Sequence, residues 1–140
     1  MIRPAEASDI PWLLDMAGRF AEQSGVDEQV GFERESVEAL MGHLIESPDG
    51  ILLVGDRGMI GGMVITHAFN SQMKVFQELF WRSEGREGLS LLKAAESAAK
   101  KLGAGRILML STENMSPERT GKLYEHFGYE RGETIYTKAL

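Results

Sequence analysis

The stretch from Trp81 to Leu102 combines a strand end, two glycines and a long amphipathic helix, an arrangement that can bind an anion. A helix N-terminus leaves backbone N–H groups free and carries a positive dipole, and glycines let a phosphate approach the backbone closely. Gly85 and Gly88 flank Arg86 at this point. The pattern predicts a site for an anionic ligand such as a pyrophosphate. A plain strand-to-helix turn that uses two glycines explains it equally well.

A second stretch, residues 122–130 (KLYEHFGYE), places a tyrosine near the end of a helix. Leu123 and Phe127 continue an apolar helix face, and Gly128 ends the helix. Tyr124 could there present its hydroxyl to a cleft as a proton donor. The alternative is a half-buried aromatic ring that keeps its hydroxyl in water, and the pattern alone favours this structural interpretation.

Several other chemistries lack the residues that they need. The chain has no cysteine, which excludes disulfides, thiolate metal sites and cysteine nucleophiles. His43, His67 and His126 have no second histidine or carboxylate at ligand spacing, so no metal site is expected. The sequence contains no G-x-S-x-G, G-x-G-x-x-G or P-loop motif, which argues against a hydrolase and against dinucleotide or nucleoside triphosphate folds.

Length and composition fit a single domain that spans residues 1–140. Hydrophobic residues make up 43% and charged residues 26% of the chain, as in soluble globular proteins. The 15 Lys and Arg against 21 Asp and Glu give a net charge of −6, which disfavours nucleic acid as a partner. No apolar run exceeds four residues, and residues 1–10 carry acids and a proline. We therefore expect neither a membrane span nor a signal peptide, and a cytoplasmic protein.

The chemistry-bearing stretches must be positioned by a mixed set of strands and helices. The hydrophobic patterns and turn signals predict strands at residues 2–4, 51–54, 59–67, 74–81, 106–112 and 130–138. They predict helices from Ser8 or Asp9 to about Gly25, over 36–46, from the 83–88 loop to about 102, and over 117–127. Gly61 and Gly62 suggest a bulge. The order of elements from residue 74 onward implies a right-handed parallel crossover between strands 74–81 and 106–112.

Taken together, the element order and three strings resemble the GNAT superfamily of N-acetyltransferases. IRPAEASDI (2–10) resembles that family's first strand and helix cap. WRSEGREGLSLLKAAESAAKKLGA (81–104) resembles its acetyl-CoA pyrophosphate loop, long helix and closing Gly-Ala, and KLYEHFGYE resembles its C-terminal tyrosine signature. The resemblance implies an α/β fold: a three-layer α/β/α sandwich whose mostly antiparallel sheet contains one splayed parallel strand pair.

The family's pyrophosphate loop usually reads Q/R-x-x-G-x-G/A, and this sequence departs from it. Two alignments of this pattern are possible. If Gly88 takes the last position, Ser83 takes the first and Arg86 stands where the inner glycine belongs. If Arg82 takes the first position and Gly85 the inner glycine position, Glu87 stands where the last small residue belongs. The carboxylates of this loop would repel a pyrophosphate unless they point away, and Arg86 could pair with phosphate.

The resemblance also implies a mechanism in which a neutral amine attacks the thioester of acetyl-CoA directly. The pantetheine arm would lie between strands 74–81 and 106–112, where a backbone N–H stabilises the oxyanion. Tyr124 would be the general acid and Glu78 the base, although Glu78 is equally well explained as a strand carboxylate at a sheet edge. The implied cofactor-binding residues are Leu79, Phe80, Trp81, Ser83, Gly85, Arg86, Glu87, Gly88, Leu89 and Asn114. A loop or cap role explains Asn114 somewhat better.

These observations lead to an acetyl-CoA-dependent N-acetyltransferase that needs no metal and acts on a small amine or a protein amino group. The alternative is a GNAT-like module that binds CoA or a protein without catalysis; transfer of longer acyl chains stays open. The acceptor segments implied by the fold are 23–35 and 68–74. The acids of the first would suit a cationic acceptor: Asp27, Glu28, Glu33 and Glu35. The resemblance also implies that the chain could form a homodimer through sheet edges or its C-terminal strand.

Overall fold

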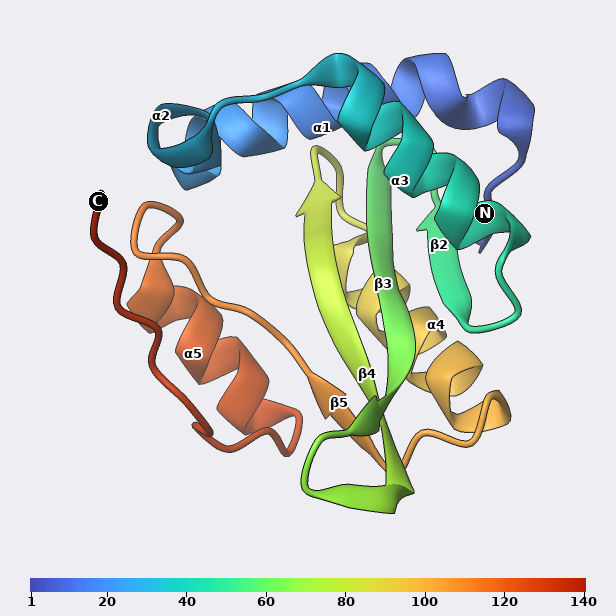
Figure 1. Ribbon diagram of the computed structural model, residues 1–140, viewed down its shortest axis with the longest axis vertical. Helices are drawn as coiled ribbons and strands as arrows, with labels where there is room; N and C mark the ends of the chain where they lie inside the picture. Colours follow the sequence, from blue (N-terminus) through green and yellow to red (C-terminus); the bar gives the residue numbers. More distant parts are fainter.

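The computed structural model describes residues 1–140 and consists of a five-stranded sheet with helices on both faces (Figure 1). The spatial order of the strands follows the chain, and all neighbours are antiparallel except β4 and β5, which are parallel. The strands are β1 (Arg3–Pro4), β2 (Gly50–Val54), β3 (Gly58–His67), β4 (Asn70–Ser83) and β5 (Arg106–Leu108). The mostly antiparallel sheet with one parallel pair confirms the architecture implied by the sequence.

The helices form the two outer layers of the sandwich. In Figure 1, α1 and α3 lie together on one side of the sheet, and α4 crosses behind it. The helices are the 3₁₀ turn η1 (Ala7–Asp9), α1 (Ile10–Ser24), α2 (Val26–Val30), α3 (Arg34–Glu46), α4 (Gly88–Lys101) and α5 (Pro117–His126). The short helix α2 has no counterpart among the sequence predictions, because its five residues are too few to show a periodic apolar stripe.

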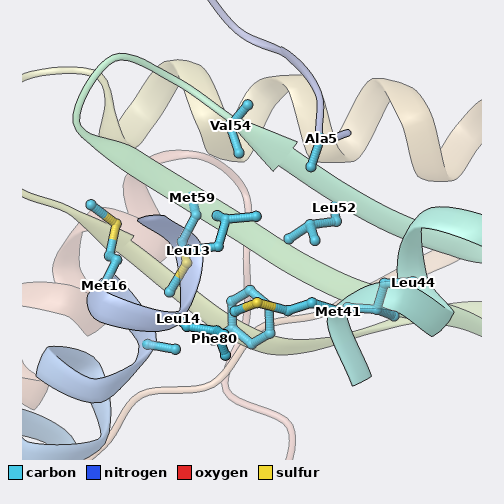
Figure 2. Close-up of a cluster of buried hydrophobic side chains, with 11 residues drawn as sticks. Ala5, Leu13, Leu14, Met16, Met41, Leu44, Leu52, Val54, Met59 and Phe80 are labelled. Carbon is cyan, nitrogen blue, oxygen red and sulfur yellow. The ribbon is translucent and has the colours of Figure 1, made fainter. Parts of the chain in front are cut away.

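Each face of the sheet carries its own hydrophobic core. The first core packs α1 and α3 against the sheet through Leu13, Met41, Met59 and other buried side chains (Figure 2). The second packs α4 and α5 against the opposite face. Strand β2 shows why the apolar run 51–54 is continuous: Leu52 belongs to the first core and Leu53 to the second. A strand covered on both faces buries every side chain.

A β-bulge interrupts the pairing of β3 with β4, as the two glycines predicted. Gly61 pairs with Phe80 and Gly62 with Glu78, so Leu79 has no partner across the ladder. A Cβ at Gly62 would lie 2.2 Å from the Gln77 carbonyl oxygen, which explains why this position has no side chain. Because the extra residue shifts the alternation, Phe80 joins the first core.

Three strand predictions need correction. The predicted strand 106–112 is paired only over Arg106–Leu108. The strand predicted over 74–81 is longer and begins at Asn70, which pairs with His67 in a tight hairpin. The predicted strand 130–138 is wrong: no backbone partner is present, and Ile135 and Tyr136 are 76% and 92% exposed. An alternating segment forms a strand only if a sheet edge pairs with it.

No helix in the structure is both long enough and apolar enough to cross a bilayer. No group of three or more His, Asp or Glu side chains is arranged to hold a metal ion.

Candidate functional site

The parallel strands β4 and β5 form a fork whose arms separate after three residue pairs. Val75, Phe76 and Gln77 pair with Arg106, Ile107 and Leu108, and the ladder ends there. Glu78, the next residue of β4, is only 3% exposed. Its carboxyl group accepts a hydrogen bond from the backbone N–H of Leu110, which no longer has a strand partner. Burial raises the pKa of Glu78 to about 8, although this hydrogen bond opposes the shift.

Tyr124 binds the same residue of the separated arm from the other side. Its hydroxyl donates a 2.7 Å hydrogen bond to the Leu110 carbonyl oxygen, and the residue is 8% exposed. Its ring packs beside those of Trp81 and Tyr129, with centroid separations of 6.0 Å and 5.2 Å. Burial raises the pKa of the Tyr124 hydroxyl, and the nearby Glu78 carboxylate and Tyr129 act in the same direction. The phenol therefore keeps its proton at neutral pH.

The local sequence explains how α5 brings Tyr124 to the fork. Ser116 adopts a left-handed conformation, with φ of 50°, and so turns the chain just before Pro117 starts the helix. Tyr124 lies two turns further along the helix, and it is the one fully buried side chain of α5. The tyrosine thus anchors α5 to the sheet and presents its hydroxyl to the fork.

A pocket of about 450 Å³ opens where the fork widens. Its walls come from the C-terminal part of α1, the end of β4, the segment 110–115 and α5. The lining residues are Phe20, Gln23, Glu78, Trp81, Arg82, Ser83, Glu84, Gly88, Leu110, Ser111, Thr112, Met115, Thr120 and Tyr124. The two residues predicted to be catalytic, Glu78 and Tyr124, therefore share one pocket with the start of α4.

The remaining residues of the predicted cofactor set are divided among several places. Gly85, Arg86 and Glu87 line a second hollow of about 390 Å³ together with Asp56, Arg57 and Ser90. Leu79 occupies the bulge and is 39% exposed, whereas the Phe80 side chain is buried in the first core. Leu89 packs against the second core.

Asn114 is a further predicted cofactor residue that lies outside the pocket wall. Its side-chain amide lies against Gly25, where a Cβ would be only 2.5 Å from the amide nitrogen. Gly25 has φ of 83° and ends α1. The contact therefore joins the segment before α5 to the corner between α1 and α2, a structural role that the sequence had also allowed.

The two loop carboxylates have protein partners of their own. Glu87 accepts hydrogen bonds from the backbone N–H groups of Asp56 and Arg57 in the turn between β2 and β3. Glu84 pairs with the guanidinium groups of Arg82 and Arg19. Both carboxylates thus have positively charged or N–H partners within the protein, which reduces the repulsion of a pyrophosphate that the sequence led us to expect.

The start of α4 also indicates a different alignment of the loop pattern. Gly88 is the first residue of the helix, and the indole N–H of Trp81 donates to its carbonyl at 3.1 Å. A third alignment is therefore open, in which Gly88 takes the inner glycine position, Gly85 comes first and Ser90 comes last. Ser90 lines the second hollow together with Arg86.

The acceptor segments predicted from the sequence are corrected in part. Gln23 lines the pocket, but none of the four acids Asp27, Glu28, Glu33 and Glu35 does. The segment 68–74 is the tip of the β3–β4 hairpin, at the opposite end of the 14-residue strand β4 from the pocket (Figure 1).

The polar wall of the pocket on the α1 side has no counterpart among the site residues predicted from the sequence. In the sequence, Arg82 was considered only as the first residue of one alignment of the loop pattern. In the structure its side chain is 9% exposed and hydrogen-bonds Gln23 of α1. An arginine that directly follows the apolar strand end Phe80–Trp81 was the available signal. The face of the sheet on which Arg82 lies depends on the bulge, and the alternation of apolar and polar residues in the sequence does not reveal the position of the bulge.

Comparison with known proteins bears on the fold. No protein-family model matches the sequence, and no curated protein matches it significantly. The chain is similar to solved structures over its full length. A transcriptional regulator from Bacillus halodurans C-125 gives a TM-score of 0.77 at 17% identity, with 100% of this chain and 99% of that chain covered.

Several of the similar structures are named as acetyltransferases. An aminoglycoside acetyltransferase from an uncultured soil metagenomic sample gives a TM-score of 0.73 at 12% identity, covering 100% of this chain and 97% of that one. Ribosomal-protein-alanine N-acetyltransferase from Brucella melitensis biovar Abortus 2308 gives 0.70 at 13% identity, with 100% and 98% covered. At these identities the likeness concerns the fold, and the chain has the fold of the GNAT acetyltransferases.

Proposed function

We propose that the protein is an acetyl-CoA-dependent N-acetyltransferase that transfers the acetyl group to a primary amine by direct attack. The observation that carries this proposal is the fork, which opens beyond Gln77 into a pocket lined by Glu78, the start of α4 and Tyr124. Structural similarity to proteins named as acetyltransferases supports it.

The residues around the fork fit acetyl-CoA, which supplies an acetyl group already activated as a thioester. Beyond Gln77, the β5-side edge of β4 has no strand partner, so its backbone groups are free to pair with the amides of the pantetheine arm. The first turn of α4 offers unpaired N–H groups and a positive dipole for the pyrophosphate. Arg57 and Arg86 line the adjacent hollow, whereas Glu87 is turned toward the β2–β3 turn.

Tyr124 is proposed as the proton donor to the leaving thiolate. Its raised pKa keeps the hydroxyl protonated, and its single proton is shared with the Leu110 carbonyl at 2.7 Å. A sulfur in the pocket would compete for this proton with a neutral carbonyl oxygen, which is a weaker acceptor than a thiolate. The hydroxyl would therefore stabilise the thiolate by a hydrogen bond from a site that the protein has already oriented.

Glu78 is proposed as the proton acceptor for the amine, directly or through water. With a pKa of about 8, the carboxyl group is protonated in most molecules at neutral pH. It can accept a proton only after it has lost its own, so this role requires activity to increase as the pH approaches 8. The same carboxyl group also holds Leu110 in place, and the two roles predict different pH profiles.

A calorimetric titration with acetyl-CoA, with CoA and dephospho-CoA as comparisons, tests the proposal first. Micromolar affinity for acetyl-CoA, followed by acetyl transfer in an amine panel that Tyr124→Phe impairs, is the expected result. Failure to bind at millimolar acetyl-CoA would contradict the proposal and indicate a non-catalytic module. Binding without transfer to any amine would reject the catalytic part alone.

A further inference from the structure

The α1 side of the pocket carries an excess of one positive charge. Two guanidinium groups share one carboxylate oxygen there: Arg19 Nε lies 2.6 Å and Arg82 Nη2 lies 2.8 Å from Oε1 of Glu84. No other carboxylate lies within salt-bridge distance of either arginine. These guanidinium groups also lower the pKa of Glu84, Arg82 more than Arg19, so Glu84 is ionised.

Arg82 is the arginine of this cluster that lies in the pocket wall, and it is the least solvated of the three residues. The Arg82 side chain is 9% exposed, compared with 25% for Glu84 and 45% for Arg19. A cation out of water needs a counter-charge or a full set of hydrogen bonds. Arg82 donates to Gln23 and Glu84, but its Nε has no partner.

Glu84 is the carboxylate that offsets Arg82 in the pocket wall, but it is shared with Arg19, which lies outside the lining. The charged residues of the lining are Glu78, Arg82 and Glu84. Glu78 is protonated in most molecules at neutral pH because burial raises its pKa to about 8. Thr112 also lines the pocket, and its hydroxyl is buried without a partner. Buried polar atoms without a partner are rare, so these atoms mark a place where a ligand or a water can supply the missing hydrogen bond.

The geometry separates Arg82 from the part of the site proposed for the cofactor. Met59 pairs with Arg82 across the β3–β4 ladder, and Met59 belongs to the core on the α1 and α3 side. Trp81, the neighbouring residue, packs against the core on the α4 side and hydrogen-bonds Gly88. The Arg82 guanidinium therefore lies on the sheet face opposite the start of α4.

We infer that the acceptor amine carries an anionic group, a carboxylate or a phosphate, which Arg82 binds at the α1 wall of the pocket. This inference rests on the proposed function and specifies the substrate class. It reverses the cationic acceptor that the acidic segment 23–35 had suggested, because the acids of that segment lie outside the pocket.

The test compares acceptor pairs that differ only in the anion. The pairs are β-alanine and β-alaninamide, 4-aminobutyrate and its amide, and phosphoethanolamine and ethanolamine, with rates expressed per unprotonated amine. The inference expects a kcat/KM at least about tenfold higher for the anionic member of one or more pairs. The first two pairs report on a carboxylate and the third on a phosphate. Equal values, or higher values for the neutral members, would overturn it.

Two variants with opposite expected effects separate recognition from damage to the fold. Arg82→Gln removes the positive charge and should abolish the preference for the anionic acceptor, with the KM for acetyl-CoA unchanged. Glu84→Gln leaves both guanidinium groups unpaired and should increase the preference. Arg34→Gln is the matched control, because Arg34 forms an exposed ion pair with Asp15 outside the pocket. A rise in the KM for acetyl-CoA in Arg82→Gln without loss of the preference would assign Arg82 to the cofactor and overturn the inference.

Binding measurements keep this test independent of catalysis. The CoA-loaded wild-type protein is titrated with the same pairs by calorimetry. If no amine is acetylated but the anionic members bind preferentially, the proposed function fails, and Arg82 remains a binding site for an anionic ligand that is not an acetyl acceptor. If the anionic members bind no better than the neutral ones, the inference fails whatever the activity.

Discussion

The two sides of the fork differ in how they are held in the protein. Strand β4 lies in the middle of the sheet between two hydrophobic cores, and Val75, Phe76, Glu78 and Phe80 are all buried. After Ala99, by contrast, Tyr124 is the one buried residue. The arm formed by β5, segment 109–116 and α5 is attached by three ladder pairs, by the hydrogen bond from Leu110 to Glu78, and by Tyr124 and partly buried side chains that pack on the second core. One wall of the pocket is thus fixed by fully buried apolar packing and the other by fewer contacts, most of them only partly buried.

This difference indicates how the site can be both positioned and open. Apolar cores maintain the shape of β4 and the start of α4, because a close-packed interior resists deformation. The arm formed by β5, segment 109–116 and α5 has few buried contacts, and regions of this kind open locally at a low cost in free energy. The pocket forms where the tightly packed strand β4 meets this more loosely held arm.

The largest effect is expected from the core beneath the fixed wall. Phe76 is 0% exposed, so Phe76→Ala should lower the free energy of unfolding by about 3–5 kcal/mol through lost apolar contacts and a cavity. Urea denaturation measures this change. Ile135→Ala is the control, because this side chain is 76% exposed and its loss should change stability by less than about 0.5 kcal/mol. Similar losses for the two variants would show that the tail contributes as much packing as the core.

Glu78 should make the stability of the protein depend on pH in an unusual direction. Its pKa is raised from 4.5 to about 8, so between these values the native state retains a proton that the unfolded state releases. Stability from this group is therefore complete below pH 4.5 and falls as the pH rises to about 8. From pH 5 to 7.5, wild type should lose about 3 kcal/mol relative to Glu78→Gln.

The activity profile of the same variant distinguishes the two roles of Glu78. As a base, Glu78 should give a rate that increases with pH up to about 8, and Glu78→Gln should remove this dependence. If it only holds Leu110, the variant should keep the pH profile of the wild type. If the difference in unfolding free energy between wild type and Glu78→Gln is the same at pH 5 and pH 7.5, the Glu78 carboxyl group is solvated and its pKa is not raised.

Tyr124→Phe should affect catalysis more than stability. Loss of the hydroxyl is expected to lower kcat by about a hundredfold, with little change in the affinity for acetyl-CoA. The Leu110 carbonyl loses its donor, so stability should fall by about 1 kcal/mol. Steady-state kinetics and calorimetry measure the two effects. Unchanged turnover would remove Tyr124 from the mechanism.

The smallest effect is expected from the exposed tail. Removal of residues 131–140, all of them exposed, should change the free energy of unfolding by less than about 0.5 kcal/mol. Size-exclusion chromatography of the full chain and the truncated chain provides the check on assembly. A large loss of stability, or a change of oligomeric state on truncation, would show that the tail is paired in solution.

Local pattern predicted the well-packed part of the molecule better than the fork. The apolar run 51–54, the glycines at 61–62 and the stripe of α4 each have one arrangement that buries them, so the sheet and its main helices followed from the sequence. Strand 106–112 was predicted too long because nothing in its own residues indicates that Glu78 takes the Leu110 N–H. The tail was predicted as a strand because alternation does not reveal whether a partner is present.

The candidate site was predictable to the extent that its residues form a recognisable string. Tyr124, Gly88 and Trp81 belong to such strings and line the pocket. Arg82 and Thr112 do not, because their importance comes from burial and from the lack of hydrogen-bond partners in three dimensions. The acids at 27–35 drew attention by composition, yet they lie away from the pocket.

The bulge at Leu79 also determines which side chains of β4 face each side of the pocket. Phe76 and Trp81 contact the same core although they are five residues apart, a spacing that simple alternation would place on opposite faces. One inserted residue thus sends the indole toward the start of α4 and the guanidinium of Arg82 toward α1. If Leu79 instead took a place in the ladder, every residue after it would face the other side of the sheet, and these two side chains would be exchanged. Arg82 would then point toward the start of α4 and Trp81 toward α1.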